Sequence, residues 1–537
     1  MAIGSILVVV LSLASAWLLN FAYRMYRHRR RFRDLRGPPH SWLWGHLKVM
    51  GEAAATLPPN MHPQAYLTVI AQKYNLDGLF YLDLWPAAEP QLVLTSPELL
   101  DQVTVTRVLP IHQMADDYLA PMVGRNVVAA ANGPVWKKLH NSMVPAFSWS
   151  HIRSLTTVFV DECMHFRNTL DQLAKTGETF SMEDTSAKLV FDIIGKILFN
   201  FSLNAQTEGS SYLEDLREMI HLAENQLSWN PFVHISTFFR RRVVLARLNP
   251  SIMAQIKNRL SMLRQDQIVP SRKDPYSILD LMLREQLQDG GELKEGKDVE
   301  DISPEWLELL LANVKGLLVG GHGTTTDTLC YIYILLSKNP EVIQKLREEH
   351  SRILHPDFNE TLNILQASPH KLEELEYTGA VIRETLRLFP VGFSVRQAED
   401  DATISYAGKQ YAMGNVVVVN TPHTLQYDPK IYPKPDEFIP DRWMDPDNMP
   451  PRNAFRTFSR GARACLGQNL AVNELKVILV MTLRDYDFEI ADLVPNKEPR
   501  TSYTKLDTIY GDRIFQELAM EAKPPRGGTM MRVRKRS

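Results

Sequence analysis

The chain has 537 residues, of which 45% are hydrophobic and 23% are charged. These proportions are typical of a folded globular protein and exclude a disordered, a collagen-like or a simple coiled-coil chain. The formal net charge is −2 and the three cysteines are scattered, which excludes a disulfide framework, a structural zinc site and general nucleic-acid binding.

The first predicted element is an apolar helix over residues 2–23, which carry no charge. A helix of this length spans roughly 33 Å, enough for the hydrocarbon core of a membrane. Seven arginines follow within residues 24–36, and positive charge beside a first spanning helix stays on the cytoplasmic side. Ala14-Ser15-Ala16 resembles a signal-peptidase site, but the segment lacks a basic start. We therefore expect an uncleaved single-pass anchor, followed by a basic, proline-rich hinge over residues 24–45.

The body of the chain, residues 46–522, is predicted to be one large domain that is mainly α-helical with a minor β region. Alternating apolar residues predict strands, and apolar residues at helical spacing predict helices. The expected strands are 79–84 and 91–95, with strand-like segments in 395–420, and the expected helices are 181–201, 211–226, 304–337, 372–388 and 466–485. A proline-rich loop is expected over 422–451, and the tail 523–537, which has six basic residues and no acid, is expected to be a solvated end.

The sharpest chemical motif is the loop Phe458-Ser459-Arg460-Gly461-Ala462-Arg463-Ala464-Cys465-Leu466-Gly467, just before the last predicted helix. A thiol there faces the free N–H groups of the helix and the positive end of its dipole. Both effects lower the pKa of a thiol and favour the anion that binds a metal. The glycines let the backbone approach a flat, bulky group. For an isolated cysteine, a small buried thiol at a turn would be the more common interpretation.

This loop resembles the haem-binding loop of the cytochrome P-450 family, because it matches Phe-x-x-Gly-x-Arg-x-Cys-x-Gly at every fixed position. Glu384-Thr385-Leu386-Arg387 matches the Glu-x-x-Arg helix of that family, and 438–443 matches its downstream loop, whose Arg442 joins Glu384 and Arg387. The resemblance extends from the anchor to about Arg532. It implies the cytochrome P-450 fold, haem b as the cofactor, and Cys465 as the axial thiolate ligand of the haem iron.

The resemblance also implies which residues surround the haem. Arg396 and Arg463 would pair with its carboxylates, and Phe458 and Gly467 would lie beside it. The motif that begins at Trp136 normally reads Trp-x-x-x-Arg in the family, and here His140 occupies the place of the arginine. A histidine can still donate a hydrogen bond, although its charge depends on pH. A surface histidine is the alternative for His140.

The segment Gly320-Gly321-His322-Gly323-Thr324-Thr325 is similar to the oxygen-activating helix of the family. Glycine within a helix costs about 1 kcal/mol, so three in four positions indicate a purpose, such as a local loosening that seats oxygen and water. Thr324 is expected to steer protons, but Gly323 occupies the place of the acid of the family. His322, Asp327 or ordered water could replace that acid. A polar residue facing a neighbouring helix is the alternative for Asp327.

The resemblance predicts a haem-thiolate monooxygenase, similar to fungal microsomal members that tailor secondary metabolites. Electrons would come from an NADPH-dependent flavoprotein reductase, or from a small haem protein, docking near Lys137, Lys138 and Arg460. The family is typically anchored in the endoplasmic reticulum with its catalytic domain in the cytoplasm. Val391 and Phe393 are pocket candidates and favour a small, largely apolar substrate. Two alternatives stay open: a desaturase, oxidative coupling or rearranging enzyme on the same fold, and a non-enzymatic haem sensor.

Overall fold

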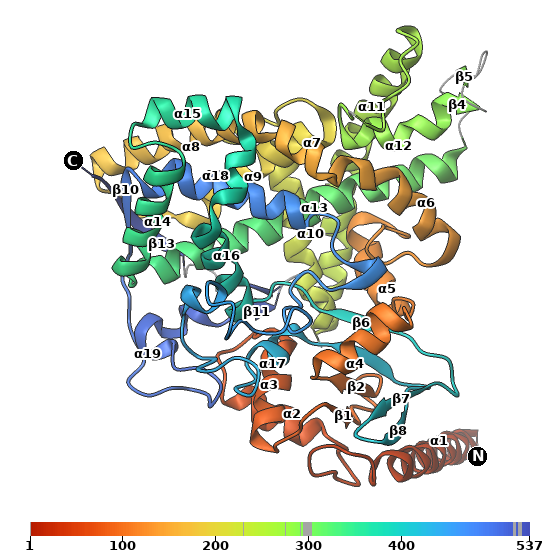
Figure 1. The fold of residues 1–537 in the computed structure, drawn as a ribbon. Coiled ribbons are helices and arrows are strands. Elements are labelled where there is room, and N and C mark those ends of the chain that lie inside the picture. Colours follow the sequence, from red (N-terminus) through yellow and green to blue (C-terminus); the bar gives the residue numbers. More distant parts are fainter. Residues whose placement is uncertain are drawn as a thin grey trace.

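The computed structural model describes residues 2–228, 230–273, 275–289, 292–293, 303–518, 522–524 and 529–536. Helices dominate and form one large core (Figure 1). Helix α13 (Pro304–Leu336) lies in the middle of this core and packs against α9 (Met182–Phe199). The hydroxyl of Ser303 caps α13 by accepting from the Trp306 N–H, and Pro304 occupies its first turn, where no partner for its nitrogen is needed.

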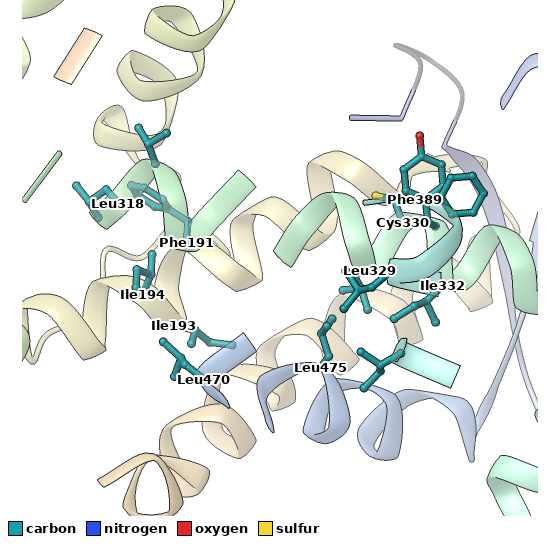
Figure 2. Packing of buried hydrophobic residues seen from close by; sticks show 14 of the residues in the cluster. Phe191, Ile193, Ile194, Leu318, Leu329, Cys330, Ile332, Phe389, Leu470 and Leu475 are labelled. Atoms are coloured by element: carbon teal, nitrogen blue, oxygen red, sulfur yellow. The ribbon is translucent and has the colours of Figure 1, made fainter. Parts of the chain in front are cut away.

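Helices α8 (Thr156–Thr176), α18 (Gln468–Leu483) and α16 (Glu376–Leu388) complete the core around α13. Their apolar side chains meet between the helices, as Figure 2 shows for Ile193, Leu329 and Leu475, which belong to α9, α13 and α18. All three side chains are at most 1% exposed. Burial of this kind contributes roughly 1.5–3 kcal/mol for each large apolar side chain.

The other helices surround this core. They are α2 (Leu47–Ala55), α3 (Pro63–Lys73), α4 (Pro97–Asp101), α5 (Gln113–Val123), α6 (Gly133–Met143), α7 (Trp149–Ser154), α10 (Ser211–Glu224), α11 (Pro231–Gln265), α12 (Ile278–Leu287), α14 (Pro340–Ile353), α15 (Phe358–Ala367), α17 (Pro422–Gln426) and α19 (Asp507–Tyr510). The predicted helices over 181–201, 211–226, 304–337, 372–388 and 466–485 are confirmed as α9, α10, α13, α16 and α18.

A four-stranded sheet forms the minor β region, in the order β1-β2-β9-β6. Its strands are β1 (Leu79–Leu82), β2 (Gln91–Leu94), β9 (Val417–Asn420) and β6 (Ser394–Arg396). Strands β2 and β9 are parallel, and the other neighbours are antiparallel. The strands predicted in this region are therefore confirmed. Short hairpins add β4 (Gln288–Asp289) with β5 (Glu292–Leu293), β7 (Thr403–Tyr406) with β8 (Lys409–Ala412), and β11 (Glu517–Leu518) with β12 (Ala522–Lys523).

The basic tail does not behave as a solvated end where it is described. Strand β13 (Met530–Lys535) pairs with β10 (Tyr486–Ile490) on one side and with β3 (Phe180–Ser181) on the other. Met531 and Val533 are almost fully buried, while Arg532 between them is half-buried and Arg534 and Lys535 are exposed. The expectation of a frayed end is thus wrong for this strand, because its alternating apolar residues outweigh its charge.

Helix α1 (Ala2–Phe32) continues nine residues beyond the predicted end of the anchor at residue 23. Its stretch Val8–Phe32 is long and apolar enough to cross a membrane. The helix projects from the body beside the sheet (Figure 1). Its last turns dock on the body, where Arg29 contacts the buried Asp83 carboxylate over 2.5 Å. The hinge over 24–45 therefore begins as helix and is partly fixed to the body.

Candidate functional site

The thiol loop, residues 458–467, holds Cys465 just before α18. The Cys465 N–H donates to the Phe458 carbonyl over 2.9 Å, so the loop closes on itself. Gly461 has a φ of 80°, and a β-carbon there would overlap the backbone oxygen of Thr104. Both the conformation and the close approach of this neighbouring segment therefore require glycine at this position.

Only one of the three cysteines has an accessible sulfur. Cys465 is exposed, whereas Cys163 and Cys330 are buried. Burial raises the pKa of both buried thiols and keeps them protonated. A β-carbon at Gly467 would lie 3.8 Å from the Cys465 sulfur, so this glycine keeps the surroundings of the thiol open. Half-buried Phe458 packs near Phe455, with 6.4 Å between the ring centroids, at the base of the loop.

Two arginines lie close together beside the thiol loop. Burial and the repulsion of Arg463 lower the pKa of Arg396 to about 10, and burial lowers the pKa of Arg463 to about 10. Arg396 is 1% exposed, donates to the Leu109 carbonyl over 3.1 Å, and has no partner for its Nε among the described residues. A buried cation next to a second, half-buried cation is costly unless an anion compensates them.

The predicted residues Trp136 and His140 join this cationic side of the site. The Arg463 guanidinium lies 3.9 Å from the centroid of the Trp136 ring, and the tilted His140 ring contacts the same indole with 4.8 Å between the centroids. The indole of Trp136 therefore contacts both side chains and connects α6 to the thiol loop. The sequence missed Asn132, whose Oδ1 accepts from Arg463 and from the Ile111 N–H, each over 2.9 Å. The only signal for Asn132 was its position directly before α6.

These features fit a haem group. The accessible thiol can supply the axial ligand, and Arg396 and Arg463 can compensate two carboxylates. On the opposite side, a β-carbon at Gly320 would meet no protein atom within 4 Å, so α13 leaves space there. A planar group with two negative charges that binds through a thiolate requires a cysteine, two cations and an open space. The site offers all three, in Cys465, in the pair Arg396 and Arg463, and at the open face of α13.

The glycine-rich segment of α13 remains helical throughout. Thr324 is half-buried, and its hydroxyl donates to the Gly320 carbonyl over 2.8 Å. A β-carbon at Gly321 would lie 2.7 Å from Ile194 of α9. The expected local loosening is therefore not observed, and Gly321 is explained by tight packing of α13 against α9. His322 is buried against Phe191, and burial, followed by the charge of Arg217, lowers its pKa to about 3.

A buried ion-pair triad of Glu384, Arg387 and Arg442 supports the region around the thiol loop. Arg387 donates two hydrogen bonds to the Glu384 carboxylate, over 2.9 and 2.8 Å, and Arg442 donates to it over 3.0 Å. Although burial opposes ionisation, the charge of Arg387 lowers the pKa of Glu384 below its ordinary value. The structure thus brings together the three predicted residues. It adds Trp443, whose Nε1 donates to Glu384 over 2.8 Å.

The two predicted pocket residues lie in different surroundings. Val391 is buried, whereas Phe393 is 44% exposed and packs edge-on against His62 at 5.1 Å. Both belong to the segment that leads into β6, which ends at Arg396. The segment therefore connects Arg396 to the apolar side chains of Val391 and Phe393.

Comparison with known proteins agrees with this geometry. The model of the family Cytochrome P450 matches residues 35–507. Cytochrome P450 monooxygenase acrF of Aspergillus aculeatus is 31% identical, over 88% of this chain and 97% of that protein. Cytochrome P450 monooxygenase polC of Polytolypa hystricis is 28% identical, over 94% of this chain and 91% of that protein. The crystal structure of the cytochrome P450DA heme domain shares the fold, with a TM-score of 0.72, 20% identity, and coverage of 94% of this chain and 97% of that one.

Proposed function

Because the chain belongs to the cytochrome P450 family, we propose that it is a membrane-anchored enzyme that oxidises a small, largely apolar organic molecule. Its class is that of a haem-thiolate monooxygenase, and haem is its cofactor. One observation carries the assignment of the ligand: Cys465 is the cysteine with an exposed sulfur, and it lies in the matching loop beside Arg463 and Arg396.

Haem bound through a thiolate supplies the reductive activation of O2, with one oxygen atom going to the substrate and the other to water. The protein contributes position, access and protons. Cys465 would bind the iron, and Arg396, Arg463 and His140 would hold the haem carboxylates. Trp136 orients Arg463 by stacking under its guanidinium. Thr324 would hold a proton at its Oγ on the oxygen-binding side, where Gly320 leaves space.

The same proposal includes the partner and the location of the enzyme. Electrons would come from an NADPH-dependent flavoprotein reductase, or from a small haem protein. The exposed Lys137 and Lys138 begin α6 next to Trp136 and would meet an acidic surface there, together with Arg460. Helix α1 would anchor the chain in the endoplasmic reticulum membrane, with the catalytic domain on the cytoplasmic side.

The buried Val391 and the fungal origin of the relatives support an apolar substrate of secondary-metabolite type. A second outcome of the chemistry is supported by Gly323, because an altered proton supply favours desaturation, coupling or rearrangement over oxygen insertion. Labelling with 18O2 separates them: hydroxylation puts one labelled atom into the product, and the other reactions put none. A product without label would contradict the hydroxylase assignment.

The test of the haem ligand is the absorption spectrum of the reduced, carbon monoxide-bound protein in membranes. We expect a strongly red-shifted Soret band for the unmodified chain and for the control Cys330→Ala, whose sulfur is buried. We expect no such band for Cys465→Ser. A red-shifted band that survives Cys465→Ser would refute the ligand assignment, and the absence of haem from folded unmodified protein would refute the proposed function.

A further inference from the structure

A polar cavity of about 360 Å³ lies behind the glycine-rich segment of α13. Its walls come from the start of α9, one face of α10, α13 and Lys523 of β12. On α13, the lining residues are Val319, His322, Gly323, Thr326 and Asp327. These positions recur every three or four residues, so they form one continuous stripe of the helix. We call this space the α13 cavity.

The stripe borders the oxygen-binding side of the helix. Successive residues of an α-helix are turned by about 100°, so Asp327 and Thr324, three residues apart, are neighbours on its surface. Gly323 is the cavity-lining residue directly before Thr324, and it has no side chain to fill this edge of the cavity. Asp327 is 7% exposed and is thus the carboxyl group that both lines the cavity and adjoins Thr324.

His322 shows that the cavity must hold a polar occupant. The residue is 4% exposed, and neither of its ring nitrogens has a hydrogen-bond partner among the described residues. Buried polar groups almost always have partners, which are ordered water molecules where the protein supplies none. The α13 cavity has room for several water molecules. A neutral imidazole can accept a hydrogen bond from water at one nitrogen and donate a hydrogen bond from the other.

Charged groups at the outer walls of the cavity connect it to solvent. Asp184 binds Arg217 over 2.7 Å and Lys188 over 2.8 Å, and Glu224 binds Lys523 over 2.9 Å. Arg217 and Glu224 are half-buried, and both line the cavity. The cavity therefore runs from half-exposed charged residues to the buried His322, Gly323 and Asp327. A chain of water molecules along such a lining can carry protons.

We propose that the α13 cavity is a hydrated proton-supply site and that Asp327 replaces, from one helical turn further along, the acid that Gly323 lacks. The Asp327 carboxylic acid gives its proton to the Oγ of Thr324, directly or through one water molecule, and Thr324 passes its own hydroxyl proton to the oxygen-binding side. Water in the cavity then reprotonates the Asp327 carboxylate from solvent. His322 holds this water at the inner end of the cavity.

The proposal rests on the proposed function, and its first test uses the full-length enzyme with its reductase. NADPH oxidation is measured without added substrate in H2O and in D2O. General acid groups contribute 10²–10⁴-fold to proton transfer, and solvent retains some access, so Asp327→Asn is expected to slow the reaction by about tenfold or more and to enlarge the solvent isotope effect. Gly323→Asp combined with Asp327→Asn returns a carboxyl group to the cavity edge and should recover most of the rate.

Matched variants separate this role from a structural one. Glu308→Gln makes the same chemical change at an exposed position of α13 and should leave rate and isotope effect unchanged. Asp327→Asn could lose the red-shifted carbon monoxide band and with it the haem site. In that case the rate and the isotope effect are measured in Gly323→Leu, which blocks the cavity edge and keeps every charge. An unchanged rate and isotope effect with an intact band overturns the proton-supply site while leaving the haem-thiolate assignment in place.

A second readout needs no turnover. Diethyl pyrocarbonate modifies neutral, reachable imidazoles, and mass spectrometry locates the modified peptide. His322 is expected to react in the resting protein, and Gly323→Leu is expected to slow its modification severalfold. His350 is the internal control, because it is also buried, does not line the α13 cavity and forms a hydrogen bond with the Thr378 hydroxyl over 2.9 Å. If His322 is as unreactive as His350, the cavity is closed to solvent and the proposal is wrong.

Discussion

The thiol loop and the glycine-rich segment of α13 would both border the proposed haem, but their geometry depends on different kinds of interaction. In the thiol loop, Cys465 is placed by a backbone hydrogen bond to Phe458, seven residues away, and by the conformation of Gly461. The cavity beside the glycine-rich segment is assembled from α9, α10, α13 and Lys523 of β12. A short motif therefore specifies the ligand, whereas the proton supply depends on tertiary contacts.

This difference predicts that the largest effect comes from the ligand itself. Cys465→Ser removes the sulfur, and no other cysteine can replace it, because Cys163 and Cys330 are buried. We expect complete loss of the red-shifted carbon monoxide band and of NADPH-dependent oxidation. Retention of substantial oxidation in this variant would show that the thiol loop is not the ligand-bearing side.

The next largest effect is expected from the triad that supports the thiol loop. Glu384→Gln leaves the fully buried Arg387 without its compensating charge. Breaking a buried ion pair typically costs about 3–5 kcal/mol, so the free energy of unfolding should fall by that order. Denaturant unfolding of detergent-solubilised protein measures the loss. Lys434→Gln, on the exposed side of the same region, is the control and should change stability little.

Thr324→Ala should separate the two regions. The variant keeps the thiol loop, so its carbon monoxide band should be normal. It loses the hydroxyl that holds a proton on the oxygen-binding side, so we expect the share of electrons released as hydrogen peroxide to rise severalfold. Hydrogen peroxide formed per NADPH consumed measures this share. An unchanged share would mean that protons reach the oxygen without Thr324.

The smallest expected effect at neutral pH is that of His322, whose contribution to stability changes only below about pH 6.5. Burial lowers the pKa of His322 from 6.5 to about 3, so the neutral ring is favoured in the folded state. The unfolded chain binds the proton more readily, and the contribution of His322 is complete above pH 6.5 and is lost as the pH falls toward 3. His322→Phe should flatten the stability curve in that window by up to about 1.4 kcal/mol per pH unit.

Denaturant unfolding at several pH values tests this expectation. His165→Phe, at an exposed position of α8, serves as the control and should leave the slope of the curve as it is in the unmodified chain. An equal slope in the His322→Phe variant would mean that the His322 ring is protonated as easily in the folded state as in the unfolded state.

The sequence predicted most elements because their patterns are local. The long helices α9, α13 and α18 have continuous apolar faces, and β1 and β2 are bounded by prolines and turn residues. The sequence-based prediction failed at two places. At residues 530–535, charge indicated a solvated end, and at the end of α1, an arginine run indicated a hinge. In both places, contacts distant in the sequence decide the structure: β10 and β3 pair with the tail, and Asp83 holds Arg29.

By itself, the sequence determined the family, the haem ligand candidate Cys465 and the ion-pair triad, because fixed residue spacings encode them. Tertiary structure decided the rest. It explained Gly321 by its packing against Ile194, brought His140 and Arg463 into contact with Trp136, and placed Asp327, His322 and Gly323 along one cavity. No sequence motif shows which group replaces the acid that is absent at Gly323. The groups around this position come from elements more than a hundred residues apart in the chain.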